Sequence, residues 1–461
     1  MAKVVNTRSA PEPVVAIPNQ VFTVGTEVYQ QRLNRLRGKM QETGLDVVAI
    51  YADKEHGANF SYLTGFGPRF EEGLLIIRPF GKPKVLLGTE NLNMANYAAI
   101  NLDAVHFPSF GLMGQPRKGS QSLKSILEDS GLERGMTVGT VGWKYFSEDD
   151  GCPADSIEIP HYLVEALVDV VGDTKRVRNV THLFMSPVDG LRTRLEAEQI
   201  IAYEYVACLV SKSMLDLMNS VEVGISEMEL ASKMQNMGLP LSAHQMVSVG
   251  DKARFGLTSP SSRQAQRGDF LTTAFGIEGA LSCRAAYIAY SEKDVPVENW
   301  LEKVAVPYFS TAVQWLESIG IGVEGGPIYE MVEKRLPQSE FGWELNPGHL
   351  IATDEWVSTP FMDGSTVALQ SGNYIQFDLI ISPKEPYFGA DLEDGIVLAD
   401  HALREEIRSL SPSTWGRFER RREYIDKVLG IELREEVLPM SDLLGYYRPF
   451  LLDRRTIFTL R

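Results

Sequence analysis

The chain has 461 residues, of which 44% are hydrophobic and 23% are charged, and its formal net charge is -16. A chain of this length exceeds what one hydrophobic core usually holds, so we expect a globular enzyme of two domains. The acidic balance argues against nucleic acid and against an anionic membrane surface as partners, because binding to either depends on basic patches.

Cysteine usage and the first residues indicate the compartment. The three cysteines, Cys152, Cys208 and Cys283, are widely spaced and odd in number, which argues against a disulfide framework and against a CxxC zinc site. The first 20 residues lack the apolar core of a signal peptide, and no apolar run reaches the length of a membrane span. We therefore expect a cytoplasmic protein.

The first part of the chain has the pattern of an α/β domain. Residues 1–25 show few periodic apolar positions and predict an arm that lies on the surface or on a neighbouring subunit. Residues 29–43 predict an amphipathic helix that ends at Gly44. Strands at 46–51, 73–78, 84–88 and 138–143, with a helix at 123–128, complete a predicted α/β domain over residues 26–184.

A second domain is predicted over residues 185–400. A linker at 185–190 leads to a long helix over 194–219, and Ser226 with Glu229 fits a capping box that opens a helix through Met237. Residues 269–275 and 281–287 alternate as two strands of a hairpin with a turn at 276–279. Helices at 300–319 and 329–334 separate this hairpin from the polar segments that follow.

The chain becomes strongly charged after residue 400. Four arginines lie around two glutamates in this region: Arg417, Arg420, Arg421 and Arg422 around Glu419 and Glu423. We interpret this pattern as a solvated helix with charge pairs rather than as a basic face for a partner. Residues 401–461 are therefore predicted to form a helical extension that packs on the second domain or on a dimer partner.

Three polar segments follow the hairpin in order: Gly348-His349, the strand 374–378 that ends in Asp378, and Glu393-Asp394. This order is similar to that of the creatinase and aminopeptidase P family. The segments YQQRLNRLRGKM, GLDVVAIY and NFSYLTGF resemble the non-catalytic N-terminal domain of the same family. The resemblance implies an α/β (α+β) protein, with a creatinase-type N-terminal domain and a pita-bread domain, that forms a homodimer.

Peptidases of that family hold two metal ions with two Asp, one His and two Glu. Matched residue by residue, the first Asp falls on Ala274, and the second falls on Cys283 or on Leu281, depending on the hairpin register. The remaining ligands correspond in order to His349, Asp378 and Glu393. Without a carboxylate at Ala274 the second ion lacks a terminal ligand, so the resemblance predicts no two-metal clamp.

The resemblance also bears on the reaction. Two histidines that those peptidases use to shuttle protons have no match near residues 257–258 or at 354–356. Creatinase, in the same family, hydrolyses a C–N bond of a small amidine without a metal ion. We therefore expect a hydrolase or lyase that uses no cofactor and acts at a C–N bond of a small polar metabolite, not an ordinary dinuclear metallopeptidase.

The candidate catalytic residues are His349, Asp378, Glu393 and Cys283. His349 suits acid/base work because its pKa is near neutrality, and Asp378 and Glu393 would orient it or relay its proton. Three roles are open for Cys283: a thiolate nucleophile, a metal ligand, or a small buried hydrophobe.

The candidate substrate-binding residues are two arginines and two aromatic residues. Arg284 or Arg254 would hold a substrate carboxylate, and Tyr287 and Trp356 would wall an apolar pocket.

Two alternatives stay open. One is a mononuclear metallohydrolase of Xaa-Pro peptidase type, in which one divalent ion such as zinc takes S, N, O and O donors from Cys283, His349, Asp378 and Glu393. The other is a non-catalytic pita-bread protein that binds a partner.

Overall fold

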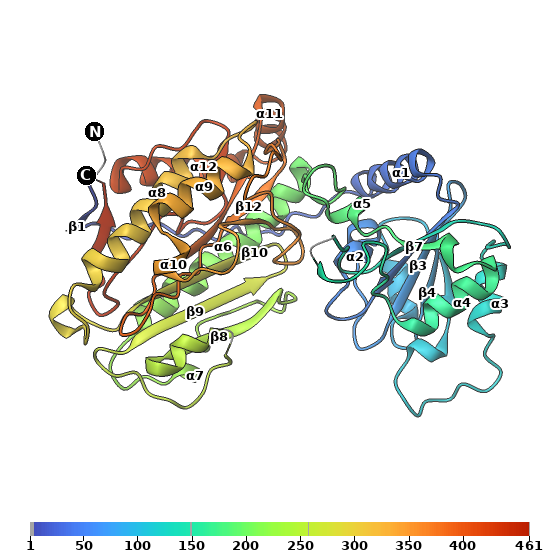
Figure 1. The fold of residues 1–461 in the computed structure, drawn as a ribbon, viewed down its shortest axis with the longest axis horizontal. Helices are drawn as coiled ribbons and strands as arrows, with labels where there is room; N and C mark the ends of the chain where they lie inside the picture. The colour runs from blue at the N-terminus through green and yellow to red at the C-terminus, as the bar shows by residue number, and fades with distance from the viewer. Residues whose placement is uncertain (1–3, 148–149, 257, 461) are drawn as a thin grey trace. The chain divides into compact units, whose positions relative to one another are not determined.

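The computed structural model describes residues 4–147, 150–256 and 258–460 (Figure 1). The chain divides into two compact units, Val24–Arg192, and Met1–Thr23 with Thr193–Arg461. Residues 1–3 of the predicted arm, residue 461 of the predicted extension and residue 257 lie outside the described residues. Among the described helices, none has the length and apolar character needed to cross a membrane.

The unit Val24–Arg192 is built on a mixed six-stranded sheet. Its strand order is β5 (Asp103–His106), β4 (Lys84–Leu87), β3 (Gly73–Ile77), β2 (Val47–Ala52), β6 (Val138–Val141) and β7 (Val177–Asn179). The helices are α1 (Thr26–Thr43), α2 (Ala58–Thr64), α3 (Leu123–Asp129), α4 (His161–Val171) and α5 (His182–Met185). Gly44 ends α1 in the left-handed conformation, with φ of 66°, as the sequence predicted.

The unit Met1–Thr23 with Thr193–Arg461 is built on a seven-stranded sheet. Six strands follow the order β11 (His349–Leu350), β12 (Tyr374–Phe377), β13 (Asp391–Leu398), β10 (Ala280–Tyr287), β9 (Phe270–Ile277) and β8 (Ala243–Val249), and β14 (Val437–Pro439) pairs with β13. The predicted hairpin is β9 and β10. Its turn is shorter than expected, because Ile277 already pairs with Ala280.

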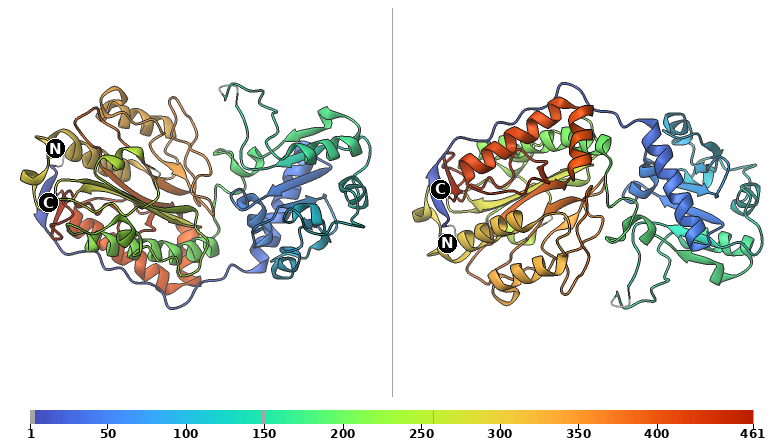
Figure 2. Two further views of the ribbon diagram at one scale, coloured as in Figure 1. Left: turned by 90° about the horizontal axis from the view of Figure 1, so that it is seen from below. Right: turned by 90° about the horizontal axis from the view of Figure 1, so that it is seen from above.

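Helices cover both faces of this sheet. Figure 2 shows α6 (Ala197–Ser220) and α12 (Pro412–Tyr424) on one face, and α8 (Val306–Ser318) and α9 (Gly325–Arg335) on the other. The remaining helices are α7 (Glu227–Ala231), α10 (Gln338–Phe341) and α11 (His401–Leu410), with π-helical turns at Leu301–Ala305 and Ile425–Leu429.

The helix that begins at Ser226 is shorter than predicted. The capping box is present, because the Ser226 and Glu229 side chains each bond to the other's backbone N–H. The helix nevertheless ends at Ala231, since the amides of Lys233 and Met234 bond to carbonyls only three residues back and Met237 takes a left-handed conformation with φ of 53°. The prediction of a helix through Met237 is wrong.

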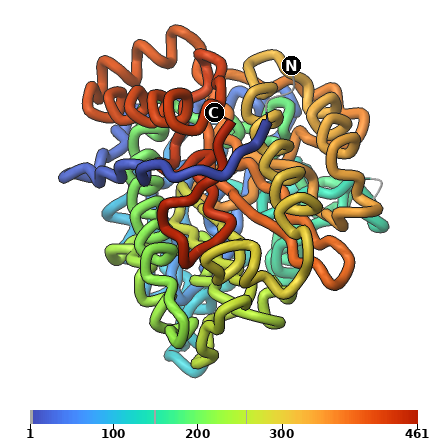
Figure 3. The backbone as a smooth tube through the Cα atoms, turned by 90° about the vertical axis from the view of Figure 1, so that its left-hand side faces the viewer, coloured from blue at the N-terminus to red at the C-terminus, as the bar shows by residue number. Residues whose placement is uncertain are grey.

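The predicted arm packs on the C-terminal end of its own chain. Strand β1 (Asn6–Ser9) pairs antiparallel with β15 (Thr456–Thr459), and Figure 3 shows these two terminal segments side by side. Arg448 Nη2 donates to Glu12 Oε1 at 2.7 Å, and Tyr424 Oη donates to Pro11 O at 2.7 Å. The two ends of the chain therefore stabilise each other.

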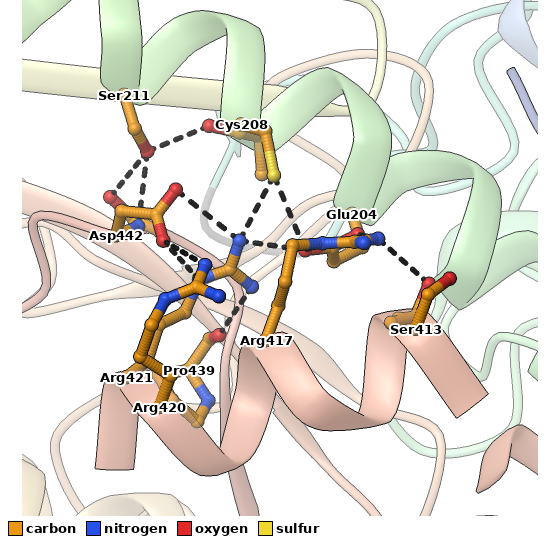
Figure 4. Close-up of polar contacts among 12 residues, drawn as sticks. Glu204, Cys208, Ser211, Ser413, Arg417, Arg420, Arg421, Pro439 and Asp442 are labelled. Atoms are coloured by element: carbon orange, nitrogen blue, oxygen red, sulfur yellow. Dashed lines mark hydrogen bonds and ion pairs between the residues drawn. The ribbon is translucent and has the colours of Figure 1, made fainter. Parts of the chain in front are cut away.

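A buried ionic cluster joins α12 to α6 (Figure 4). The Glu204 carboxylate of α6 is 0% exposed and accepts hydrogen bonds from Arg417 Nε at 2.8 Å and Arg421 Nη2 at 2.6 Å. Arg421 Nε also donates to Asp442 Oδ1 at 2.8 Å. Arg417 and Arg421 lie four residues apart, on one face of α12, and that face is buried. The prediction of a solvated helix is wrong for these two arginines.

Candidate metal centre

A glycine places His349 at the start of edge strand β11. Gly348 has φ of +118°, and a Cβ atom at this position would lie 3.0 Å from Gln376 O and 3.1 Å from the Trp315 ring. Trp315 Nε1 donates to Pro347 O at 2.9 Å and fixes the approach of the chain. Only glycine fits this conformation and this space, so the Gly348-His349 sequence is required by the local backbone.

Three adjacent strands bring His349, Asp378 and Glu393 together. His349 Nε2 lies 3.7 Å from Asp378 Oδ2 and 3.7 Å from Glu393 Oε1. Asp378 follows β12 directly, and Glu393 lies in β13. The three side chains are buried, with exposures of 2%, 5% and 2% for His349, Asp378 and Glu393.

A backbone carbonyl orients the His349 ring. Its Nδ1 lies 3.3 Å from Leu350 O, and a carbonyl oxygen can only accept, so the ring proton is assigned to Nδ1. The lone pair of Nε2 then points toward the two carboxylates. Burial lowers the pKa of His349, against a raising effect of Asp378, which favours the neutral ring that binds metal ions.

The two carboxyl groups lack a cationic partner. Burial raises the pKa of Asp378 and the pKa of Glu393 well above their usual values; Glu393 adds to the first shift and Asp391 to the second. Asp378 Oδ1 and Glu393 Oε1 accept no hydrogen bond from the described residues. In the part of the chain that the structure describes, no lysine or arginine forms an ion pair with either group. Uncompensated acids of this kind are costly to bury.

These residues fit a divalent metal ion. Ligands at about 2.1 Å from a tetrahedral ion lie about 3.4 Å apart, close to the 3.7 Å observed from His349 Nε2 to each carboxylate. The candidate ligand atoms of His349, Asp378 and Glu393 all lie within 4.8 Å of one another. This group overturns the expectation that the site uses no cofactor. The altered positions are visible in the sequence, but the close approach of the three surviving ligands depends on how β11, β12 and β13 pair.

Cys283 faces the same group. It pairs with Ala274 of β9 and with Glu393 of β13, so the hairpin register puts Cys283, rather than Leu281, opposite Glu393. The side chain is 8% exposed. Burial raises the pKa of the Cys283 thiol well above its usual value, and Glu393 and Asp391 add to this effect. A raised pKa disfavours the thiolate that both a nucleophile and a metal ligand need, and a bound cation would oppose this effect; the three roles predicted for Cys283 stay open.

Arg284 points away from the cluster. It follows Cys283 in β10, and successive side chains of a strand point to opposite faces. Its guanidinium donates to Asp394 Oδ2 at 2.6 Å and to Leu443 O at 2.9 Å. Arg284 therefore forms its hydrogen bonds on the face of the sheet opposite to Cys283. The prediction that it contacts a substrate carboxylate is wrong.

The contacts of Arg254 and Tyr287 are with residues outside the cluster. Arg254 donates to Tyr387 O at 3.1 Å, and its guanidinium lies 3.8 Å from the centre of the Phe388 ring. Tyr287 is fully buried, and its ring packs against those of Phe270 at 5.0 Å and Trp300 at 4.9 Å. The structure thus places Tyr287 in an aromatic core rather than in the wall of a pocket.

Trp356 is the predicted substrate-binding residue that does reach the cluster. Its ring stacks on His349, with centroids 4.3 Å apart and planes inclined by 20°. Its neighbour Glu355 is close enough to raise the pKa of His349 and the pKa of Asp378, although burial is the dominant influence on both. This segment is the one in which a proton-shuttling histidine of the family has no match.

Sequence reasoning missed Asp391. It lies two residues before Glu393 in β13, on the same face, and opposite Ala285 of β10. Burial raises the pKa of Asp391 to about 7, against a lowering effect of Arg284. Tyr308 Oη donates to Asp391 Oδ1 at 3.2 Å and accepts from Leu392 N–H at 3.0 Å. The alternation of Asp391 and Glu393 in a strand was the signal that could have revealed it.

Comparison with known proteins identifies the N-terminal unit. Residues 32–180 match the family model of the Creatinase/Prolidase N-terminal domain. No curated protein sequence matches the chain.

Solved structures are similar over most of the chain. The Xaa-Pro dipeptidase from Bacillus anthracis has 15% identity and a TM-score of 0.60, and the match covers 80% of this chain and 94% of that one. The prolidase from Pyrococcus horikoshii OT3 has 15% identity and a TM-score of 0.61, with 80% and 95% covered. The X-Pro aminopeptidase from Thermotoga maritima MSB8 has 15% identity and a TM-score of 0.57, with 78% and 95% covered.

At these identities the likeness establishes the fold and leaves the activity open. The fold extends through both units, and the predicted resemblance is confirmed at that level. The chain carries a creatinase/prolidase N-terminal domain and has the pita-bread architecture of the creatinase and aminopeptidase P superfamily.

Proposed function

We propose that the chain is a metal-dependent hydrolase that cleaves the C–N bond of small peptides of Xaa-Pro type. The observation that carries the proposal is the buried group of His349, Asp378 and Glu393, with 3.7 Å from Nε2 to each carboxylate. The substrate class is taken from similar folds, which belong to an Xaa-Pro dipeptidase and a prolidase.

His349 Nε2, Asp378 and Glu393 would hold the ion. A bound divalent ion polarises a carbonyl group and lowers the pKa of water. The Leu350 carbonyl keeps the His349 ring in the tautomer that leaves Nε2 available. Trp356 shields one face of that ring from water and offers an aromatic surface for a proline ring. Glu355, the residue before Trp356, is our candidate for accepting a proton during hydrolysis.

The test is peptide hydrolysis by the full chain after chelation and reconstitution. Gly-Pro and Gly-Ala would be offered with zinc, manganese or cobalt ions. We expect Gly-Pro cleavage that depends on metal. His349→Ala should lower it by more than about 100-fold, since even hydrogen-bond partners of metal ligands are worth about 10- to 100-fold. His401→Ala, at an exposed histidine in the first turn of α11, is the matched control.

Two results would defeat this proposal. One is the absence of cleavage of either peptide with every metal tested. The other is a His349→Ala variant that cleaves Gly-Pro as fast as the unaltered chain.

A non-catalytic role in binding a peptide is the second candidate. Trp356 stacked over His349, and Ala274 in place of a carboxylate, favour it. Calorimetry that detects Gly-Pro binding in a chain that does not hydrolyse it would support this role. The homodimer, the cytoplasmic residence and the domain boundaries at 25, 184 and 400 remain predictions.

A further inference from the structure

A second group of metal-ligand atoms lies beside the first. Cys283, Asp391 and Glu393 lie on the same face of the paired strands β10 and β13, with Cys283 opposite Glu393 and Ala285 opposite Asp391. Their candidate ligand atoms all lie within 4.8 Å of one another. Glu393 belongs to both groups, and the two oxygens of a carboxylate can bind two different ions.

The surroundings of this second group favour a cation. Arg284, the nearest arginine in β10, lies on the opposite face and is paired with Asp394 at 2.6 Å. Over residues 4–147, 150–256 and 258–460, neither a lysine nor an arginine makes an ion pair with Asp391 or Glu393. Glu393 Oε1 is buried and accepts no hydrogen bond from the residues described. Three carboxyl groups, with Asp378, thus lie together; Arg284 lowers the pKa of Asp391 without forming an ion pair with it, and His349 is the basic side chain next to the other two.

Asp391 is held as a metal ligand usually is. Tyr308 Oη donates to Asp391 Oδ1 at 3.2 Å, and the backbone N–H of Leu392 fixes the Tyr308 hydroxyl at 3.0 Å. Hydrogen bonds of this kind orient ligating carboxylates. None of the five ligand positions of the family falls on Asp391. Ala274 of β9 has no carboxylate, and Asp391 of β13 can provide the carboxylate ligand in its place.

We propose that Cys283, Asp391 and Glu393 bind a second, thiophilic metal ion beside the one held by His349, Asp378 and Glu393. One sulfur and two oxygen donors suit zinc, cobalt(II) or cadmium and do not suit magnesium, calcium or manganese. On binding, the Cys283 thiol loses its proton to solvent and the sulfur becomes the ligand. The inference rests on the proposed function for its first ion and goes beyond it in the number and type of ions.

The test is a titration of the chelated full chain with cobalt(II) alone, followed by absorbance and equilibrium dialysis. We expect two equivalents to bind, and one of them to produce a thiolate-to-cobalt charge-transfer band. Cys283→Ser should abolish the band and remove one equivalent. His349→Ala should remove the other equivalent and keep the band, and Cys152→Ser, at a thiol far from the site in sequence, should change neither.

A conservative variant distinguishes a weakened metal site from a loss of folding. Tyr308→Phe removes the hydroxyl that donates to Asp391 and accepts from Leu392 N–H, and keeps the ring. It should weaken the equivalent that produces the band by about 10- to 100-fold, with little effect on the other. Circular dichroism and thermal unfolding would show that each variant is folded.

The outcomes separate the two proposals. One equivalent that is lost in His349→Ala, with no charge-transfer band, overturns the second ion and leaves the proposed function standing. No bound cobalt overturns both. A band that persists in Cys283→Ser assigns it to another cysteine and overturns the second site.

Discussion

The buried cluster around Glu204 gives the sharpest stability prediction. Glu204→Gln keeps the shape of the side chain but removes the charge that faces Arg417 and Arg421. Removing one partner of a buried ion pair costs about 3–5 kcal/mol. Because Arg421 keeps its contact with Asp442 at 2.8 Å, we expect a cost near the lower limit, about 3 kcal/mol.

The assay is thermal unfolding followed by tryptophan fluorescence. Five of the six tryptophans, all but Trp143, lie at or beyond residue 300, so the signal reports mainly on the unit that contains Glu204. For a unit of this size, a loss of about 3 kcal/mol lowers Tm by about 6 °C. The matched control is Glu405→Gln, whose partner Arg408 lies 2.7 Å away at about half exposure. A surface pair of this type is worth at most about 1 kcal/mol.

The effect of Glu204→Gln should depend on pH. Burial by itself raises the pKa of Glu204, but the charges of Arg421 and Arg417 outweigh it, and the pKa lies below its usual value. A carboxyl group whose pKa is lowered on folding stabilises the protein above its unfolded pKa, about 4.3, and this stabilisation is lost as the pH falls through the folded pKa. The Tm difference between the two proteins should therefore shrink below about pH 4. A Tm for Glu204→Gln that matches that of Glu405→Gln at neutral pH would refute this reasoning.

Two further predictions concern the backbone around the site and the ends of the chain. Gly348→Ala should cost about 1–3 kcal/mol and weaken metal binding, because its Cβ would meet Gln376 O at 3.0 Å in a left-handed backbone conformation. Gly416→Ala in α12, where a Cβ meets nothing within 4 Å, should instead raise Tm slightly, and equal effects of the two variants in thermal unfolding would contradict the argument. Deletion of residues 1–10 removes the partner strand of β15 and should lower the Tm seen by fluorescence, whereas an unchanged Tm would show that the pairing of β1 with β15 adds no stability.

Much of the fold could be predicted because its signals are local. The caps at Gly44 and Ser226 depend on a few neighbouring residues, and the β9–β10 hairpin was predicted from two strand-like segments with a glycine-containing turn between them. The length of α7 could not be predicted, since it ends where backbone bonding changes and not where the apolar pattern stops.

The site was predicted where a motif fixed the position of a residue. His349 after Gly348, and Glu393 in its strand, follow from the order of the polar segments, and the structure brings both to the cluster with Asp378. Arg284 was misplaced because residue type was given more weight than the period of two, which sets it on the face opposite Cys283. Asp391 was missed because no family position corresponds to it.

The ion pairs between residues far apart in the chain could not be predicted from the sequence. The sequence around Arg417 and Arg421 predicts surface charges. In the structure both pair with Glu204 of α6, which lies more than two hundred residues earlier in the chain. A glutamate within the largely buried helix α6 was a signal that such a partner was needed, but nothing in the sequence identified the partner.

The metal content of the purified, untagged full chain tests the central claim most directly. Mass spectrometry after incubation with zinc, manganese or cobalt ions and dialysis should find at least one tightly bound ion per chain, with that ion lost in His349→Ala and retained in His401→Ala. A chain that retains none of these ions, or a His349→Ala variant with the same metal content as the unaltered protein, would contradict the account.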